Sequence, residues 1–390
     1  SVVDGDRLRV FDGDDLVGDM PVRVLVDDCP LYDLEPERPT TPIYPDPVAS
    51  LGEGSSPDET LRALLASPSI ADKLWAFEQY DPLVGSRTVR RPAQAEAAVL
   101  HLENDGGHGA IAVSIEGNGR RVACDPYTGA VEAVLECARN LACVGAEPLG
   151  LTNCLNFGNP EKPHIAWQLT QAVEGLADAC RALDTPVVGG NVSLYNEAPD
   201  GPIYPTPVVG MVGKLPDPAR APVNSFEEEG LVVSLAGAFR PSLAGSELEK
   251  LRGGLSDSLP SVDLAEQAAT LAAVRDAARS GLVRAAHDIA EGGIAVALAE
   301  MAIPAGIGVT AHFRRDGDEA LFGEGPGGVI LACSASDFEA LAAICGEIPF
   351  ERIGETGGTR VKVEGATASL SLQVEEAAKA YEEAVPSSFE

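Results

Sequence analysis

A run of β-branched residues that meets two glycines and an asparagine constrains the fold of this chain most strongly. The run is Val187-Val188-Gly189-Gly190-Asn191-Val192-Ser193. Its apolar start predicts a buried strand, and glycines at the strand end would let a phosphate approach the backbone N–H groups. Asn191 offers an oxygen ligand of the kind that Mg²⁺ accepts, and Ser193 adds a hydroxyl. The run therefore predicts a phosphate and metal site at a strand end.

A second stretch of the same kind lies upstream, at 149–160. It leads from an apolar strand into a loop rich in asparagine and glycine, and it contains Asn153. Two such strand ends suggest one shared nucleotide site. The alternative is a pair of ordinary turns, because Gly-Gly and Asn are common turn residues. Spacing alone favours the turns.

The charge balance of the chain excludes several classes of partner. Acidic residues outnumber basic ones by 60 to 28, which gives a net charge of −32 over 390 residues. Such a surface repels nucleic acid and anionic membranes. It is typical of a protein kept soluble at high salt, so we expect a halophilic source. No apolar run is long enough for a membrane span, and no secretory signal opens the chain. The expectation of a cytoplasmic protein comes from the cysteines, which read as reduced core residues.

The eight cysteines form no C-x-x-C pair. Several occupy apolar helical or strand positions, so we expect reduced core residues and no zinc site.

Helices and strands alternate along most of the chain, which predicts an α/β or α+β fold. Short strands around 8–10 and 22–26 are too few for a domain, so residues 1–34 are interpreted as the tail of a preceding domain. Residues 35–59 are rich in Pro, Gly and Ser and read as a linker. The first full domain is expected over 60–222 and the second, an α/β layer, over 223–390.

Two motifs resemble those of phosphoribosylformylglycinamidine synthase, the PurL subunit of purine biosynthesis. They are GGNVSLYNE at 189–197 and LTNCLNFGNPEKP at 151–163. A further segment, AHD-x-x-EGG at 286–293, resembles a mark of the wider superfamily that includes aminoimidazole ribonucleotide synthase and selenophosphate synthetase. The resemblance covers essentially the whole chain as the C-terminal part of a longer protein. It implies PurM-like architecture, in which a sheet or half-barrel domain precedes a flanking α/β domain.

The resemblance also assigns roles to single residues. Asn153 and Gly190 would contact ATP, Asn191 would bind Mg²⁺, and Ser193 would contact the formylglycinamide ribonucleotide substrate. Some family members have Asp at the position of Asn153. Asp288 and Glu324 would mark an auxiliary site, although Glu324-Gly325-Pro326 departs from the Glu-Ser-Gln of the family. The His287-Asp288 pair could act in acid–base catalysis, but a structural role at a strand end is favoured.

The family's catalytic His lies in a Ser-His-Asn-His-Pro-Ser segment of the other half, and this chain contains no such segment. The resemblance implies an ATP-dependent ligase that uses Mg²⁺ and forms an amidine from ammonia. The ammonia would come from a glutaminase subunit, PurQ, in a complex with the small PurS subunit. The chain's own N-terminal half would be a further partner, and the isolated chain would be inactive.

Two other interpretations stay open at this stage. The chain could be a noncatalytic nucleotide-binding half that serves as a scaffold, or another ATP-dependent enzyme of the same superfamily. An upstream coding region with the Ser-His-Asn-His-Pro-Ser segment would favour the amidine synthase.

Overall fold

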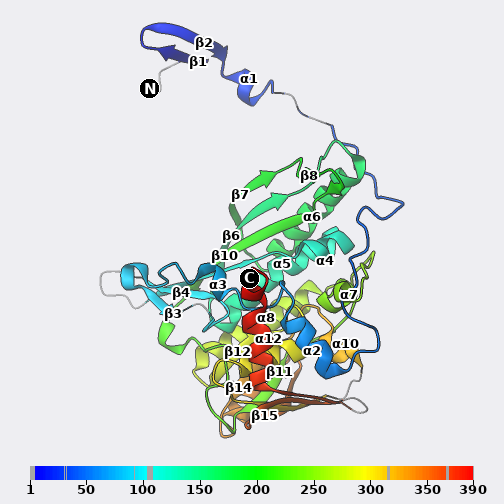
Figure 1. The fold of residues 1–390 in the computed structure, drawn as a ribbon. Coiled ribbons are helices and arrows are strands. Elements are labelled where there is room, and N and C mark those ends of the chain that lie inside the picture. Colours follow the sequence, from blue (N-terminus) through cyan, green and yellow to red (C-terminus); the bar gives the residue numbers. More distant parts are fainter. Residues whose placement is uncertain are drawn as a thin grey trace.

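The computed structural model describes residues 5–29, 31, 33–91, 93–102, 109–313, 317–365 and 369–389. Two large sheets, each accompanied by helices, build the body of the molecule (Figure 1). Both sheets combine antiparallel and parallel neighbours, so the predicted mixed α/β fold class is confirmed. Among the described helices, none is long and apolar enough to cross a membrane.

A small hairpin near the N-terminus lies apart from this body (Figure 1). Strands β1 (Arg7–Asp12) and β2 (Asp15–Pro21) pair antiparallel, and the short helix α1 (Arg23–Val26) follows. The strand expected around 22–26 is therefore wrong, because the turn at Gly13 starts the second strand earlier and 23–26 coils into α1. Large apolar side chains of the hairpin stay exposed, Phe11 by 57% and Val17 by 63%. The hairpin has no core of its own.

An irregular segment connects α1 to helix α2 (Pro57–Leu65). The helix begins at Pro57 because Ser56 and Glu59 form a reciprocal capping box, with the Ser56 N–H donating to Glu59 Oε2 at 2.8 Å. The next helix, α3 (Leu74–Phe77), is a single turn. Its start is set by Asp72, whose side chain accepts from the Leu74 N–H at 2.8 Å.

The first sheet has six strands in the order β3-β4-β5-β10-β6-β7. All neighbours pair antiparallel except β6 and β7, which are parallel. A two-stranded ribbon, β8 and β9, extends from the end of β7. The bounds are β3 (Thr88–Arg90), β4 (Ala98–His101), β5 (Ala110–Glu116), β6 (Glu147–Asn156), β7 (Val187–Ser193), β8 (Glu197–Ala198), β9 (Gly201–Pro202) and β10 (Thr206–Leu215).

Three helices belong to the first sheet: α4 (Gly119–Cys124), α5 (Pro126–Cys143) and α6 (Pro163–Ala182). Helix α5 is capped by Asp125, whose Oδ1 accepts from the Thr128 N–H at 2.9 Å, and Pro126 follows it at the first helical position. Short 3₁₀ turns, η1 (Val84–Ser86) and η2 (Pro218–Arg220), lie at the two ends of this region.

The second sheet has seven strands in the order β12-β14-β11-β15-β13-β16-β17. Its strands are β11 (Val232–Ala236), β12 (Val283–Asp288), β13 (Val309–His312), β14 (Val329–Cys333), β15 (Phe350–Thr356), β16 (Arg360–Glu364) and β17 (Ser369–Gln373). Its helices are α7 (Glu247–Leu251), α8 (Leu264–Ser280), α9 (Gly293–Ala302), α10 (Asp318–Phe322), α11 (Phe338–Cys345) and α12 (Val374–Ser387).

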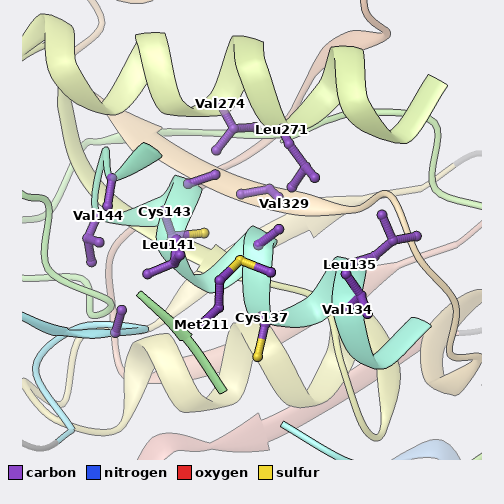
Figure 2. Close-up of a cluster of buried hydrophobic side chains, with 14 of the residues drawn as sticks. Val134, Leu135, Cys137, Leu141, Cys143, Val144, Met211, Leu271, Val274 and Val329 are labelled. Carbon is purple, nitrogen blue, oxygen red and sulfur yellow. The ribbon is translucent and has the colours of Figure 1, made fainter. Parts of the chain in front are cut away.

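Helix α5 packs between the two sheets and joins their cores. Figure 2 shows its side chains Val134 and Leu141 within a cluster that also holds Met211 of β10, Val274 of α8 and Val329 of β14. All of these side chains are almost fully buried. The two sheets and their helices therefore share a continuous apolar core. Helix α5 also carries polar side chains into this core.

Candidate functional site

The parallel pairing of β6 and β7 brings the predicted site residues together. Its register places Asn153 opposite Gly190 and Asn156 opposite Ser193. Asn191 lies between these pairs, opposite Cys154. Four residues predicted from two separate motifs thus share one strip at the edge of the first sheet.

The strip has two faces, because successive side chains of a strand point to opposite sides. Asn153 falls on the same face as Leu151 and Leu155, which belong to the core beneath the sheet. Asn191 and Ser193 fall on the other face. The residues predicted to contact ATP and those predicted to contact Mg²⁺ and substrate therefore flank the same pair of strands from opposite sides.

Gly190 is required by close packing of the backbone at this point. A Cβ added there would lie 2.6 Å from the carbonyl oxygen of Asn153 and 2.9 Å from its Oδ1. Such distances are too short for any side chain. Gly189 differs, because a Cβ there would meet only the Thr152 hydroxyl, at 3.9 Å. The second glycine thus lets the Asn153 amide lie against the backbone of β7.

Ser193 is held in place by the loop that follows it. The side-chain amide of Asn196 donates to Ser193 Oγ at 3.1 Å, to Ser193 O at 2.9 Å and to Phe157 O at 3.2 Å. These bonds tie the end of β7 to the end of β6. Asn196 was not among the predicted site residues, although it stands inside the GGNVSLYNE motif, which was the available signal.

The prediction that the run at 187 forms a buried strand is wrong. Strand β7 is the edge strand of its sheet and is exposed along almost its whole length, with Val188 exposed by 74%. Both glycines lie inside the strand and do not end it. The β-branched residues that mimic a buried strand instead form an uncovered apolar edge.

The cysteine prediction needs a similar correction at one site residue. Six cysteines are buried as expected, but Cys29 and Cys154 are only partly buried. The Cys154 Sγ accepts from Asn191 Nδ2 at 3.6 Å and faces Asn156 Oδ1 at 3.7 Å. From the sequence we expected this thiol to be a core residue, whereas the structure places it beside the side-chain amides of Asn156 and Asn191.

The residues present fit one part of a Mg²⁺ site. Asn191 Oδ1 accepts no hydrogen bond within the described residues, so this oxygen is available to a cation. A single amide oxygen does not make a complete octahedral set. Further oxygen ligands would have to come from bound phosphates, water or another polypeptide segment.

A second polar cluster lies between the two sheets, and it holds the predicted auxiliary residues. Asp288 Oδ2 at the end of β12 lies 3.2 Å from Arg139 Nε of α5. Glu324 Oε1 accepts from the N–H groups of Glu247 and Gly292, at 2.7 and 2.9 Å. Glu324 Oε2 lies 3.6 Å from Arg121 Nη1. Both predicted auxiliary residues are thus already paired with arginine or N–H groups of the protein itself.

The space beside this cluster is small. The cavity lined by Arg121, Arg139, Glu136 and Glu324 measures about 20 Å³. That is room for a water molecule and not for a nucleotide. The auxiliary site is therefore closed in this conformation.

Burial governs the protonation of the acids in the cluster. It raises the pKa of Glu324 to about 7, against the opposing effect of Arg120 and Arg121. Burial also raises the pKa of Glu116 to about 8, and the charge of Asp288 adds to this. The Asn140 amide donates to Glu116 at 2.6 Å. These carboxyl groups take up protons far more readily than exposed ones do.

His287 is buried on the strand that ends in Asp288. Its Nδ1 lies 2.7 Å from the Asp288 carbonyl oxygen, and its Nε2 lies 3.6 Å from both Glu96 Oε1 and Glu300 Oε2. Although burial opposes the charge, the nearby Glu96 and Glu300 raise the pKa of His287 to about 9. These contacts agree with the favoured structural role, because His287 ties β12 to its neighbours.

Glu96, His287 and Asp288 also place their possible ligand atoms within 4.8 Å of one another. A metal ion there would sit beside the guanidinium of Arg139, which already pairs with Asp288. The positive charge of Arg139 disfavours a second cation at this point.

Known protein families match both sheets of the structure. The AIR synthase related protein N-terminal domain matches residues 94–215, and the corresponding C-terminal domain matches residues 228–365. The first match spans the β6–β7 strip and the second contains the AHD-x-x-EGG segment. The chain belongs to the AIR synthase related family.

Within this family the chain is a homologue of the PurL subunit of phosphoribosylformylglycinamidine synthase, as its motifs predicted. It is 42% identical over 397 residues to PurL of Moorella thermoacetica, which covers 98% of this chain and 53% of that protein. It is 43% identical over 397 residues to PurL of Anaeromyxobacter sp. (strain Fw109-5), covering 95% and 50%. The chain thus spans about half the length of the curated relatives that it matches.

Solved structures confirm the predicted PurM-like fold. T. maritima PurL complexed with FGAR superposes with a TM-score of 0.66 at 17% identity, covering 83% of this chain and 53% of that one. The PurLQS structure from Thermotoga maritima gives 0.58 at 24% identity, covering 91% and 50%. T. maritima PurL complexed with ATP gives 0.56 at 23% identity, covering 91% and 49%.

Proposed function

We propose that this chain supplies one half of the active site of an ATP-dependent amidine synthase and corresponds to the C-terminal part of PurL. The reaction would convert formylglycinamide ribonucleotide to formylglycinamidine ribonucleotide. The observation that carries the proposal is the β6–β7 strip, where Asn153, Gly190, Asn191 and Ser193 meet in one register. The PurL relatives are about twice as long as this chain.

In the proposed reaction the amide oxygen of the substrate attacks the γ-phosphorus of ATP and ADP leaves. Ammonia then adds to the activated carbon, and inorganic phosphate leaves to give the amidine. Mg²⁺ would neutralise charge on the phosphates. The strip would hold the reactants in place, with Asn153 and the Gly190 backbone at ATP, Asn191 at the cation and Ser193 Oγ at the substrate.

The strip contributes binding groups but no proton-transfer group. Amide and hydroxyl side chains are too weakly basic to serve as general bases near neutral pH. We therefore propose that a catalytic histidine comes from the other half of the protein. That half would also provide further metal ligands.

Two exposed apolar surfaces support the proposal that another half packs against this chain. The edge strand β7 exposes Val187, Val188 and Val192, and the β1–β2 hairpin exposes nearly all its side chains. We propose that residues 1–34 complete a domain of the other half and that 35–59 link it to this one. The remaining division would be a domain at 60–222 and an α/β domain at 223–390.

The proposed partners follow from the relatives. One of the similar solved structures is that of PurLQS from Thermotoga maritima. We propose that this chain, joined to its other half, receives ammonia from a PurQ glutaminase in a complex that includes PurS. The auxiliary role of Asp288 and Glu324 stays a prediction, and their buried pairing favours a structural one.

Isothermal titration tests the nucleotide assignment. The assembled two-half enzyme would be titrated with a nonhydrolysable ATP analogue and Mg²⁺, comparing wild type with Gly190→Val. We expect binding at least about tenfold weaker, because the side chain would displace Asn153 and block approach to the backbone. The matched control is Gly189→Ala, where the Cβ has room. Unchanged affinity in a folded Gly190→Val variant would contradict the assignment.

A further inference from the structure

The amide of Asn191 could in principle turn either its oxygen or its nitrogen toward a ligand. Only the oxygen can bind a cation, because the NH₂ group is a donor. A rotation of 180° exchanges the two at little steric cost. Something in the protein must therefore set the direction of this amide if Asn191 is to act as a metal ligand.

A short chain of hydrogen bonds reaches Asn191 from the neighbouring strands. Asn156 Nδ2 lies 2.9 Å from the Thr206 carbonyl oxygen and 3.1 Å from that of Cys154. Carbonyl oxygens only accept, so they fix the nitrogen of Asn156 on their side. The oxygen of Asn156 must then face the other way, where the Cys154 thiol lies at 3.7 Å.

The Cys154 thiol transmits the orientation of the Asn156 amide to Asn191. Because Asn156 Oδ1 only accepts, the Cys154 S–H must donate to it, and the sulfur lone pairs then face Asn191. Asn191 Nδ2 donates to the sulfur at 3.6 Å. The amide oxygen of Asn191 is left pointing away from Cys154. The direction of Asn191 is thus set by two backbone carbonyls acting through Asn156 and Cys154.

We propose that Cys154 is a positioning residue that aims the Asn191 oxygen at a Mg²⁺ ion bound on its own face of the strip. The proposal rests on the function proposed above. It accounts for a partly buried thiol among the site amides, a position that core packing alone does not explain. The pairing register supports it, because Cys154 and Asn191 are direct neighbours on the same face of the sheet.

The variant Cys154→Ala would remove both the donor and the acceptor of this relay. The Asn191 amide could then rotate, and part of the population would present NH₂ to the cation. We expect the Mg²⁺ concentration for half-maximal activity to rise by about 3- to 10-fold, the effect of one hydrogen bond. At saturating Mg²⁺ the kcat should stay within about twofold of wild type, because the cation itself selects the competent rotamer.

The conservative variant Cys154→Ser keeps one O–H donor and an acceptor, so it should recover most of the Mg²⁺ affinity. Cys180→Ala is the matched control, because Cys180 is a buried thiol of helix α6 away from the strip. It should leave the Mg²⁺ dependence unchanged. A merely structural role for Cys154 would instead lower thermal stability and kcat without a selective effect on Mg²⁺.

A double-mutant cycle on the assembled two-half enzyme decides between the outcomes. If Cys154 acts through Asn191, Cys154→Ala should have no further effect on Mg²⁺ dependence in an Asn191→Ala background. Equal effects of Cys154→Ala in both backgrounds would overturn the relay. An Asn191→Ala variant with unchanged Mg²⁺ dependence would instead contradict the proposed function of the strip, so the two failures are distinguishable.

Discussion

Arg139 Nε lies 3.2 Å from Asp288 Oδ2 in an ion pair buried between the two sheets. Arg139 belongs to α5 of the first sheet, and Asp288 ends β12 of the second. Both side chains are about 95% buried. The residue that family resemblance marks as a possible auxiliary ligand thus neutralises a buried cation and connects the two parts of the body.

Removal of the Arg139 charge should destabilise the protein strongly. In Arg139→Ala, the buried Asp288 would lose its partner, and we expect a loss of about 3–5 kcal/mol in the free energy of unfolding. Arg352→Ala is the control, because Arg352 pairs with Glu355 on the surface and should cost less than about 1 kcal/mol. Denaturant unfolding followed by circular dichroism measures both. Equal losses of unfolding free energy in the two variants would show that the buried ion pair contributes no more to stability than the surface pair.

Stability should fall as pH rises from 6 to 9. The pKa of Glu116 is raised from 4.5 to about 8, and that of His287 from 6.5 to about 9. Between the ordinary and raised values the folded protein holds more protons than the unfolded chain, so each pH step upward favours unfolding. The expected loss is of the order of 1 kcal/mol or more, measured as the melting temperature across this range.

The variant Glu116→Gln separates this effect from general charge repulsion. It removes one of the raised groups, so its melting temperature should fall less steeply with pH than that of wild type. Glu347→Gln changes an exposed acid and should leave the slope as it is. If the melting temperature of Glu116→Gln fell with pH as steeply as that of wild type, Glu116 would not contribute to the pH dependence.

Added KCl should raise the melting temperature. The net charge of −32 makes like charges repel across the surface, and salt screens this repulsion within a Debye length of about 8–10 Å near physiological ionic strength. Thermal scans from 0.1 M to 2 M KCl measure the effect. A melting temperature that is flat or decreases with salt would argue against the proposed halophilic origin.

The exposed edge of the first sheet should be required for assembly. Val188→Asp places a charge on β7 where the side chain is 74% exposed, so the free energy of unfolding should change by no more than about 0.5 kcal/mol. Binding to the other half should weaken at least about tenfold, measured by sedimentation velocity. Val48→Asp is the control, at an exposed valine of the connecting segment. Equal binding by both variants would place the interface elsewhere.

Periodicity was sufficient for the elements that carry a full apolar face. Helices α5, α6 and α8 and strands β11 and β14 are of this kind, because burial imposes a helical or strand repeat on their apolar residues. Elements without such a face leave no clear repeat in the sequence, including the one-turn helix α7 and strand β15, whose alternation is broken by a bulge. The prediction that strand β7 is buried failed for the opposite reason. Its valines look like core, yet nothing in the described chain covers them.

The site could be predicted only as far as single motifs reach. Asn153, Gly190, Asn191 and Ser193 stand in two motifs, and the structure brings them to one strip. Their distribution over two faces depends on the pairing register, which a sequence does not state. The roles of Cys154 and Asn156 depend on hydrogen bonds between strands, so composition could only class the thiol as core.

The most direct test of the central claim is turnover by the chain alone and with its other half. The assay measures ADP release with formylglycinamide ribonucleotide, ATP, Mg²⁺ and ammonium chloride. We predict no substrate-dependent release from the 390-residue chain, because its strip binds but transfers no proton, and removal of a general acid–base group alone costs about 10²–10⁴ in rate. Addition of the other half in trans should restore release. Substrate-dependent turnover by the chain alone would contradict a shared active site.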